Sequence, residues 1–234
     1  MRTLTAACLL VSSTAWAVPY TEAPVTNGGK IAGKVTYDGV PPKPTMETVK
    51  QDPAVCGATH PNDSWIVGAD KGVENVVVYI TEIASGKKMA APTAPVLDQK
   101  GCHYVPAVLV IAAGATLQVK NSDPILHNVH EYQGQGGATV LNLAMPKQGM
   151  VIPKKISKAG GTTLKCDVHS FMRGMVFVAA NPYYALTGKD GKFEITDVPA
   201  GTYQVSTFHE VGSPRTETVT VAAGATASFN PKIK

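Results

Sequence analysis

Three side chains that can bind a metal ion lie within seven consecutive residues: the thiol of Cys166, the imidazole of His169 and the thioether of Met172. A second imidazole, His127, lies in an upstream segment at positions 124–130. Sulfur ligands are soft and suit Cu(I), and imidazole suits copper in both oxidation states. Two histidines, one cysteine and a weak axial methionine are the ligand set of electron-transfer copper sites. The spacing therefore predicts one copper ion held by His127, Cys166, His169 and Met172.

Each of these residues has an ordinary explanation when it is taken alone. An isolated Cys-x2-His pair is commonly accidental, and a lone methionine is more often part of a core. The conjunction of three donors directly after a β-like segment, with a second histidine upstream, favours the metal site. Met175 remains an alternative to Met172 as the axial ligand.

The other histidines and methionines are assigned to packing or to the surface. His130 would face away from His127 in a strand, because successive side chains point to opposite faces. We expect surface positions for His60 and His103, a structural or exposed position for His209, and packing at the edge of the site for Met145 and Met150.

The N-terminus has the pattern of an export signal. Arg2 precedes an apolar run from Leu4 to Val11, and Ala15-Trp16-Ala17 has the form of a signal-peptidase site. We expect residues 1–17 to be a signal peptide and the mature protein to be periplasmic. No later stretch is apolar over ~18 residues, so we expect a soluble chain without a membrane span. The net charge of +4, without a basic cluster, argues against nucleic acid as a partner.

The cysteine count indicates one disulfide and one free thiol. The chain has four cysteines, and Cys8 would leave with the signal peptide. An odd number in an oxidising compartment needs an explanation. The simplest is a Cys56–Cys102 disulfide, which leaves Cys166 as the thiol with a function.

Short runs rich in valine, threonine, tyrosine and isoleucine, bounded by turn residues, predict an all-β protein. We see no sustained helical period. The expected strands are 29–37, 75–81, 107–111, 116–121, 127–132, 154–156, 162–166, 175–179, 192–195, 202–207, 217–221 and 227–230, and 41–65 is expected to be irregular.

Residues 104–178 resemble the amicyanin and plastocyanin branch of the cupredoxins. The resemblance rests on Tyr104-x-Pro106, Gly114-x-Thr116, Asn121, His127-Asn128-Val129-His130 and Cys166-x2-His169-x-Phe171-Met172-Arg173-Gly174. It implies a Greek-key β-sandwich in which histidine ring nitrogens, a thiolate and an axial methionine bind copper. It also implies that Asn128 ties the ligand loops together.

The ligand loop departs from the amicyanin pattern at three positions. Val168 and Ser170 stand where that family has proline, and Asp167 places an acidic group beside the thiolate. A negative charge at this point should favour Cu(II) and lower the reduction potential.

The flanking segments resemble a carboxypeptidase-regulatory-like β-sandwich. Gly33-x-Val35, Gly39-x-Pro41 and Asn75-Val76-Val77-Val78 are similar to its opening, and Thr187-x-x-Asp190-Gly191-x-Phe193 through Tyr203 is similar to its remainder. The resemblance implies a structural or docking module. We therefore expect a cupredoxin domain at 94–181, inserted into a second small β-sandwich formed by 28–93 together with 182–234.

The function expected from these features is single-electron transfer between redox protein partners. A partner would dock on an apolar patch near the copper loops formed by Val129, Pro146, Phe171 and Met175. Copper binding or delivery without a redox circuit is the alternative. We expect no enzymatic activity, because a catalytic site needs a second copper or an open coordination position and the sequence shows no further histidine cluster. The ligand set also argues against a purely structural adhesive module.

Overall fold

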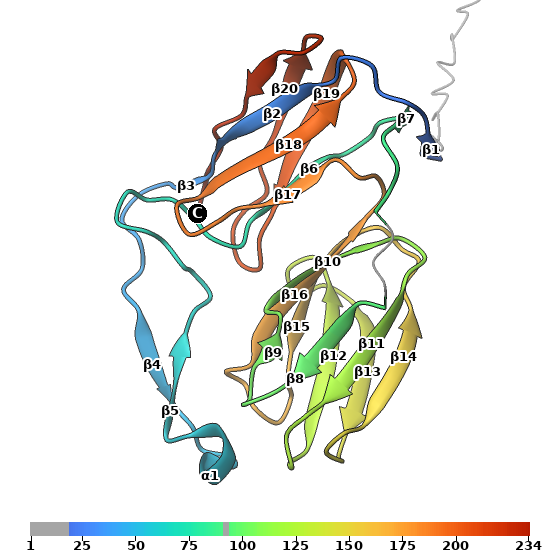
Figure 1. Cartoon of the computed structure of the whole chain (residues 1–234). Helices are drawn as coiled ribbons and strands as arrows, with labels where there is room; N and C mark the ends of the chain where they lie inside the picture. Colours follow the sequence, from blue (N-terminus) through green and yellow to red (C-terminus); the bar gives the residue numbers. More distant parts are fainter. Residues whose placement is uncertain (1–18, 91–93) are drawn as a thin grey trace, which may run out of the picture.

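The computed structural model describes residues 19–90 and 94–234, and the predicted signal peptide lies outside them. The described residues form two β-sandwiches and a projecting arm (Figure 1). Their one helix is the single turn α1 (Pro53–Cys56). The all-β class with two sandwiches, expected from the sequence, is confirmed.

The first sandwich is built from the two ends of the chain. One sheet has the order β18-β2-β21, and the other has the order β17-β6-β19-β20. Alternate residues of β18 are buried, which is the pattern of a strand with one face on a core. The strands are β2 (Gly29–Lys34), β6 (Val77–Ile80), β17 (Tyr184–Leu186), β18 (Lys192–Val198), β19 (Gly201–Phe208), β20 (Thr216–Val221) and β21 (Thr226–Ser228).

The second sandwich is built from the middle of the chain. Its sheets have the orders β10-β16-β15-β12-β13 and β14-β11-β8-β9. Leu97, Leu117, Val129, Leu164 and Val176 belong to the core between them. The strands are β8 (Val96–Gln99), β9 (Tyr104–Val105), β10 (Val108–Ala112), β11 (Thr116–Asn121), β12 (His127–Gln133), β13 (Thr139–Met145), β14 (Val151–Lys155), β15 (Gly160–Lys165) and β16 (Arg173–Ala179).

Strand β16 is buried on both faces because it lies between the two sandwiches. Val176 and Val178 point into the second core, whereas Met175 and Phe177 pack against Phe208 of the first sandwich. A continuous apolar run is typical of a strand covered on both sides. The alternation places Met175 on the opposite face from the second core.

Residues 45–62 form an arm that projects from the first sandwich along the second (Figure 1). It consists of β4 (Thr45–Thr48), α1 and β5 (Thr59–Asn62), and β4 pairs with β5 in antiparallel register. The Cys56–Cys102 disulfide ties it to the second sandwich. The sequence predicted this disulfide correctly but missed the hairpin, because a two-strand ribbon has little hydrophobic alternation.

Short strand pairs complete the fold. β1 (Thr21–Glu22) pairs with β7 (Ser85–Gly86), and β3 (Thr36–Tyr37) pairs with β22 (Lys232–Ile233). Within the described ranges, no helix has the length and apolar character that crossing a membrane requires.

Candidate metal centre

Two neighbouring strands bring the predicted ligands to one end of the second sandwich. His127 is the first residue of β12, and Cys166 follows the last residue of β15. These strands pair in antiparallel register, with His130 opposite Lys165. The turn before β16 therefore folds back over the start of β12, and it carries His169 and Met172.

The structure brings His127, Cys166 and His169 together in the interior. They are 0%, 2% and 1% exposed, and their ligand atoms all lie within 4.8 Å of one another. The two Nδ1 atoms are 3.0 Å apart, and Sγ of Cys166 is 3.8 Å from Nδ1 of His169. We call these three residues the metal cluster.

Each imidazole of the metal cluster has a carboxylate on its other nitrogen. Nε2 of His127 is 2.9 Å from Asp123, and Nε2 of His169 is 3.0 Å from Asp52. An ionised carboxylate only accepts hydrogen bonds, so each Nε2 carries the hydrogen and each Nδ1 presents a lone pair. Two lone pairs at 3.0 Å repel unless a cation lies beside them. The donor set therefore fits a metal ion bound through both Nδ1 atoms and the thiolate.

Burial and hydrogen bonding keep this arrangement in the charge state that a metal needs. Burial lowers the pKa of His127, which favours the neutral imidazole. Burial also raises the pKa of Asp123, but the N–H groups of Cys102 and Gly101 and the His127 ring outweigh it. The net result is a pKa of Asp123 below its usual value, so this group is an acceptor at neutral pH.

Backbone and side-chain hydrogen bonds fix the sulfur atom. The N–H groups of Asn128 and His169 donate to Sγ of Cys166 at 3.5 and 3.4 Å. The amide side chain of Asn128 donates to Asp167 at 2.8 Å and accepts from its N–H at 2.6 Å. The loop tie implied for Asn128 is thus present in the structure.

The two candidate methionines lie in different cores. Met172 is 1% exposed and packs in the same core as Cys166 and Phe171, and its N–H donates to the carbonyl of His169 at 2.9 Å. Met175 packs between the sandwiches. Met145 is buried and its sulfur accepts from Gln99 at 3.1 Å.

The remaining histidines lie outside the metal cluster. His130 binds Asp167 through Nδ1 at 2.9 Å, on the face away from His127 as expected. His103 is exposed, as expected. The surface position expected for His60 is wrong: its ring is 3% exposed and lies 4.4 Å from Phe171. His209 is buried against Trp65, with ring centroids 4.5 Å apart, and burial lowers its pKa to about 4.

The exposed apolar patch expected near the copper loops is absent, because three of its four residues are buried. Val129, Phe171 and Met175 are 1%, 6% and 1% exposed, because they fill the two cores, and only Pro146 is exposed. Beside His127, Leu126 reaches the surface at 42% exposure.

Asp52 and Asp123 are functional residues that the sequence reasoning missed. Asp123 lies four residues before His127 and could have been found as a local partner. Asp52 has no such signal, because it lies 117 residues from His169 in the chain.

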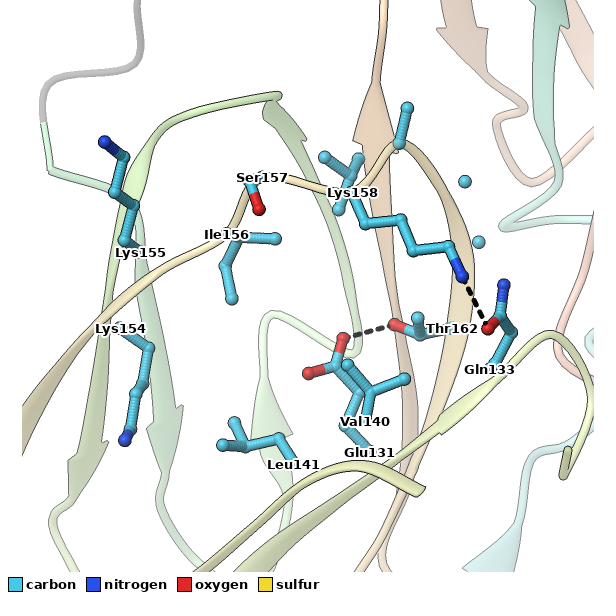
Figure 2. A pocket seen from close by; sticks show the side chains of 14 residues that line it. Glu131, Gln133, Val140, Leu141, Lys154, Lys155, Ile156, Ser157, Lys158 and Thr162 are labelled. Atoms are coloured by element: carbon cyan, nitrogen blue, oxygen red, sulfur yellow. Dashed lines mark hydrogen bonds between the residues drawn. The ribbon is translucent and has the colours of Figure 1, made fainter. Parts of the chain in front are cut away.

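A cavity of about 190 Å³ lies toward the other end of β12, and none of the predicted ligands lines it. Glu131 lines it and accepts a hydrogen bond from Oγ1 of Thr162 at 2.6 Å (Figure 2). Burial raises the pKa of this carboxyl group. Glu131 is four residues from His127, roughly 13 Å along a strand, so the cavity is separate from the metal cluster.

No protein-family model matches the chain, and no curated protein is similar to it. Solved structures are similar to part of it. A reduced Cu(I) form of an amicyanin variant is 31% identical over 38% of this chain and 86% of its own, with a TM-score of 0.33. Another reduced amicyanin variant is 28% identical over 44% of this chain and 98% of its own, also with a TM-score of 0.33.

A Cu-containing nitrite reductase from Thermus scotoductus is also similar in structure. It is 23% identical over 42% of this chain and 25% of its own, with a TM-score of 0.34. The sequence-based prediction that the chain has no enzymatic activity is corrected by this finding, because an enzyme stands among the similar structures. With TM-scores of this size, we base the function on the site geometry. About two fifths of this chain is similar in structure to amicyanin and to a copper nitrite reductase, which share the cupredoxin fold.

Proposed function

We propose that this chain is a mononuclear copper protein that carries single electrons, with His127, Cys166, His169 and Met172 as the ligands. One observation carries the proposal: two buried Nδ1 atoms 3.0 Å apart, beside a buried thiol. Bound copper would supply the one-electron couple between Cu(II) and Cu(I).

The donor set supports copper over harder ions. A thiolate and two imidazoles with a weak thioether suit copper, whereas carboxylate and carbonyl oxygens suit magnesium or calcium. Met172 supports the axial position better than Met175, because it shares a core with Cys166.

The surrounding residues support electron transfer because they limit movement. Asp123 and Asp52 orient the two imidazoles, and two N–H groups hold the sulfur. Outer hydrogen bonds of this kind fix ring orientation and tune a metal site. A buried site with fixed ligands excludes water and has little to rearrange when the charge changes.

The wider organisation is part of the same proposal. We propose that 94–181 is the copper domain, inserted between 28–93 and 182–234, and that 1–17 directs export to the periplasm. The redox partner docks where apolar side chains reach the surface beside His127, at Leu126 and Pro146.

A copper titration followed by a redox titration tests the proposal against copper delivery. We expect one copper per chain, reversible one-electron reduction, and slow loss of Cu(I) to a chelator. A carrier of copper would lose Cu(I) rapidly and show no reversible couple. Leu126→Ser should slow electron transfer to a soluble redox protein without changing the potential, and the exposed Val140→Ser is the matched control.

A further inference from the structure

The arm reaches the metal cluster through the carboxylate of Asp52. Oδ2 of Asp52 lies 3.0 Å from Nε2 of His169. Asp52 is the N-cap residue of α1, yet its side chain makes no capping hydrogen bond. Aspartate at this position normally caps the helix. Its carboxylate is turned to the histidine instead.

The backbone of Asp52 supports the same reading. Its φ is 53°, in the left-handed region that residues other than glycine rarely adopt. Such conformations persist where surrounding structure holds them and are concentrated at functional sites. Pro53 follows directly and begins the helix.

The disulfide joins the two carboxylates that hold the histidines. Cys56 ends α1, and its N–H donates to the carbonyl of Asp52 at 3.0 Å. Its partner Cys102 donates its N–H to Oδ2 of Asp123 at 2.8 Å. Asp123 in turn holds His127. The disulfide thus connects the segment that carries Asp52, the partner of His169, to the residue that donates to Asp123, the partner of His127.

Packing closes the arm over the ligand turn. Val49 is 5% exposed and belongs to the second core. The centroid of the His60 ring lies 4.4 Å from that of Phe171 and 4.1 Å from that of His103. Arg173 lies 3.9 Å from Glu47. Glu47 and His60 come from the two strands of the arm, and they contact Arg173 and Phe171, which lie next to and within the turn that carries the ligands.

We propose that the arm is a disulfide-clamped cover that positions both histidines through Asp52 and Asp123 and closes access to Cys166. Opening the Cys56–Cys102 bond releases the arm and leaves His169 without its carboxylate. The effect on copper rests on the proposed function, whereas the closure of Cys166 does not.

The first test uses the metal-free protein. Cys166 is the free cysteine among the described residues and is 2% exposed. Its alkylation by N-ethylmaleimide is followed by mass spectrometry of the peptide that contains it. In Cys56→Ser/Cys102→Ser the rate should rise at least about tenfold, because a local clamp is lost. Rates within about twofold of the unmodified protein would overturn the proposal.

Reduction gives the same comparison without a substitution. A dithiol reductant breaks the sulfur–sulfur bond and becomes a cyclic disulfide, and Cys56 and Cys102 are left as protonated thiols. Cys166 alkylation after reduction should match the double-serine variant. Circular dichroism reports whether either form has unfolded.

Asp52→Ala keeps the disulfide and tests the cover even where the double-serine variant unfolds. Alkylation of Cys166 should accelerate, and the Cu(II) affinity should fall by about 10–100-fold, as for other outer partners of metal ligands. Asp52→Asn should change both the alkylation rate and the Cu(II) affinity less than Asp52→Ala does, because its amide oxygen still accepts a hydrogen bond from Nε2. Gln51→Ala, an exposed neighbour, is the control. Unchanged alkylation and affinity in Asp52→Ala would refute the role of Asp52.

The two proposals fail in different ways. If the variants are alkylated faster but the unmodified protein does not bind copper, the copper function is refuted and the role of the arm as a cover stands. Copper binding that is equally tight in all variants, with equal alkylation, removes the cover and leaves the copper function.

Discussion

Asn128→Ala should destabilise the metal-free protein, because the side chain ties the two ligand loops. It makes three hydrogen bonds: one to Asn142, one to the Asp167 carboxylate and one from the Asp167 N–H, at 2.9, 2.8 and 2.6 Å. Asn128 is 5% exposed, so water cannot replace the side chain easily.

The magnitude follows from the partners. A hydrogen bond contributes about 0.5–1.5 kcal/mol net. Two of the three partners can return to water, because Asn142 is exposed and the Asp167 side chain is 50% exposed. We therefore expect a loss near ~2 kcal/mol, or about 4–8 °C in Tm for a protein of this size.

Urea denaturation followed by circular dichroism measures this loss. Asn142→Ala is the matched control, because it removes hydrogen bonds to Asn128, Asp167 and His130 from an exposed position, and it should cost less than about 1 kcal/mol. Equal losses in both variants, or a loss below about 0.5 kcal/mol in Asn128→Ala, would refute the reasoning.

Three further predictions concern other parts of the molecule. Burial raises the pKa of Glu210 to about 7 in the folded protein. The folded state therefore loses stability as the pH rises from the ordinary pKa of a glutamate through 7, because the buried carboxyl group must then ionise. Glu210→Gln should therefore stabilise the protein by up to ~3 kcal/mol in urea denaturation near pH 8 and lose that gain near pH 4, and equal gains at both would contradict this. Asp167→Asn should raise the reduction potential of the copper form in a redox titration, because a negative charge beside the thiolate is removed; an unchanged or lower potential would count against it. Met172→Leu should alter the electron paramagnetic resonance spectrum of the Cu(II) form, and Met175→Leu, whose residue packs between the sandwiches, should not; the reverse outcome would make Met175 the axial ligand.

The metal cluster could be predicted from the sequence because Cys166 and His169 lie in one turn and His127 lies in a motif of its own. Cys166, His169 and Met172 lie in one turn, and the antiparallel pairing of β12 with β15 brings His127 beside them. Side-chain alternation along β12 separated His130 from the metal cluster correctly. The pairing of β12 with β15 is a long-range contact, because β13 and β14 lie between them in the chain, and the sequence indicated it only through the His127-Asn128-Val129-His130 motif.

The support of the cluster was out of reach because it comes from a distant segment. Asp52 lies between the strands of a ribbon that shows no apolar alternation, and its backbone is in the left-handed region. Strand β13 was missed for a related reason: most of its side chains are exposed or half-buried, so no hydrophobic pattern marks it. The expected patch failed at Met175, because the sequence shows that β16 is apolar but not that the first sandwich covers it.

The most direct test of the copper site is the visible absorption spectrum after addition of one equivalent of Cu(II), with Cys166→Ala measured beside it. An intense thiolate-to-copper charge-transfer band that is absent from the variant is the predicted result. A weak spectrum that is the same in both proteins would contradict it, because Cys166 would then not bind copper.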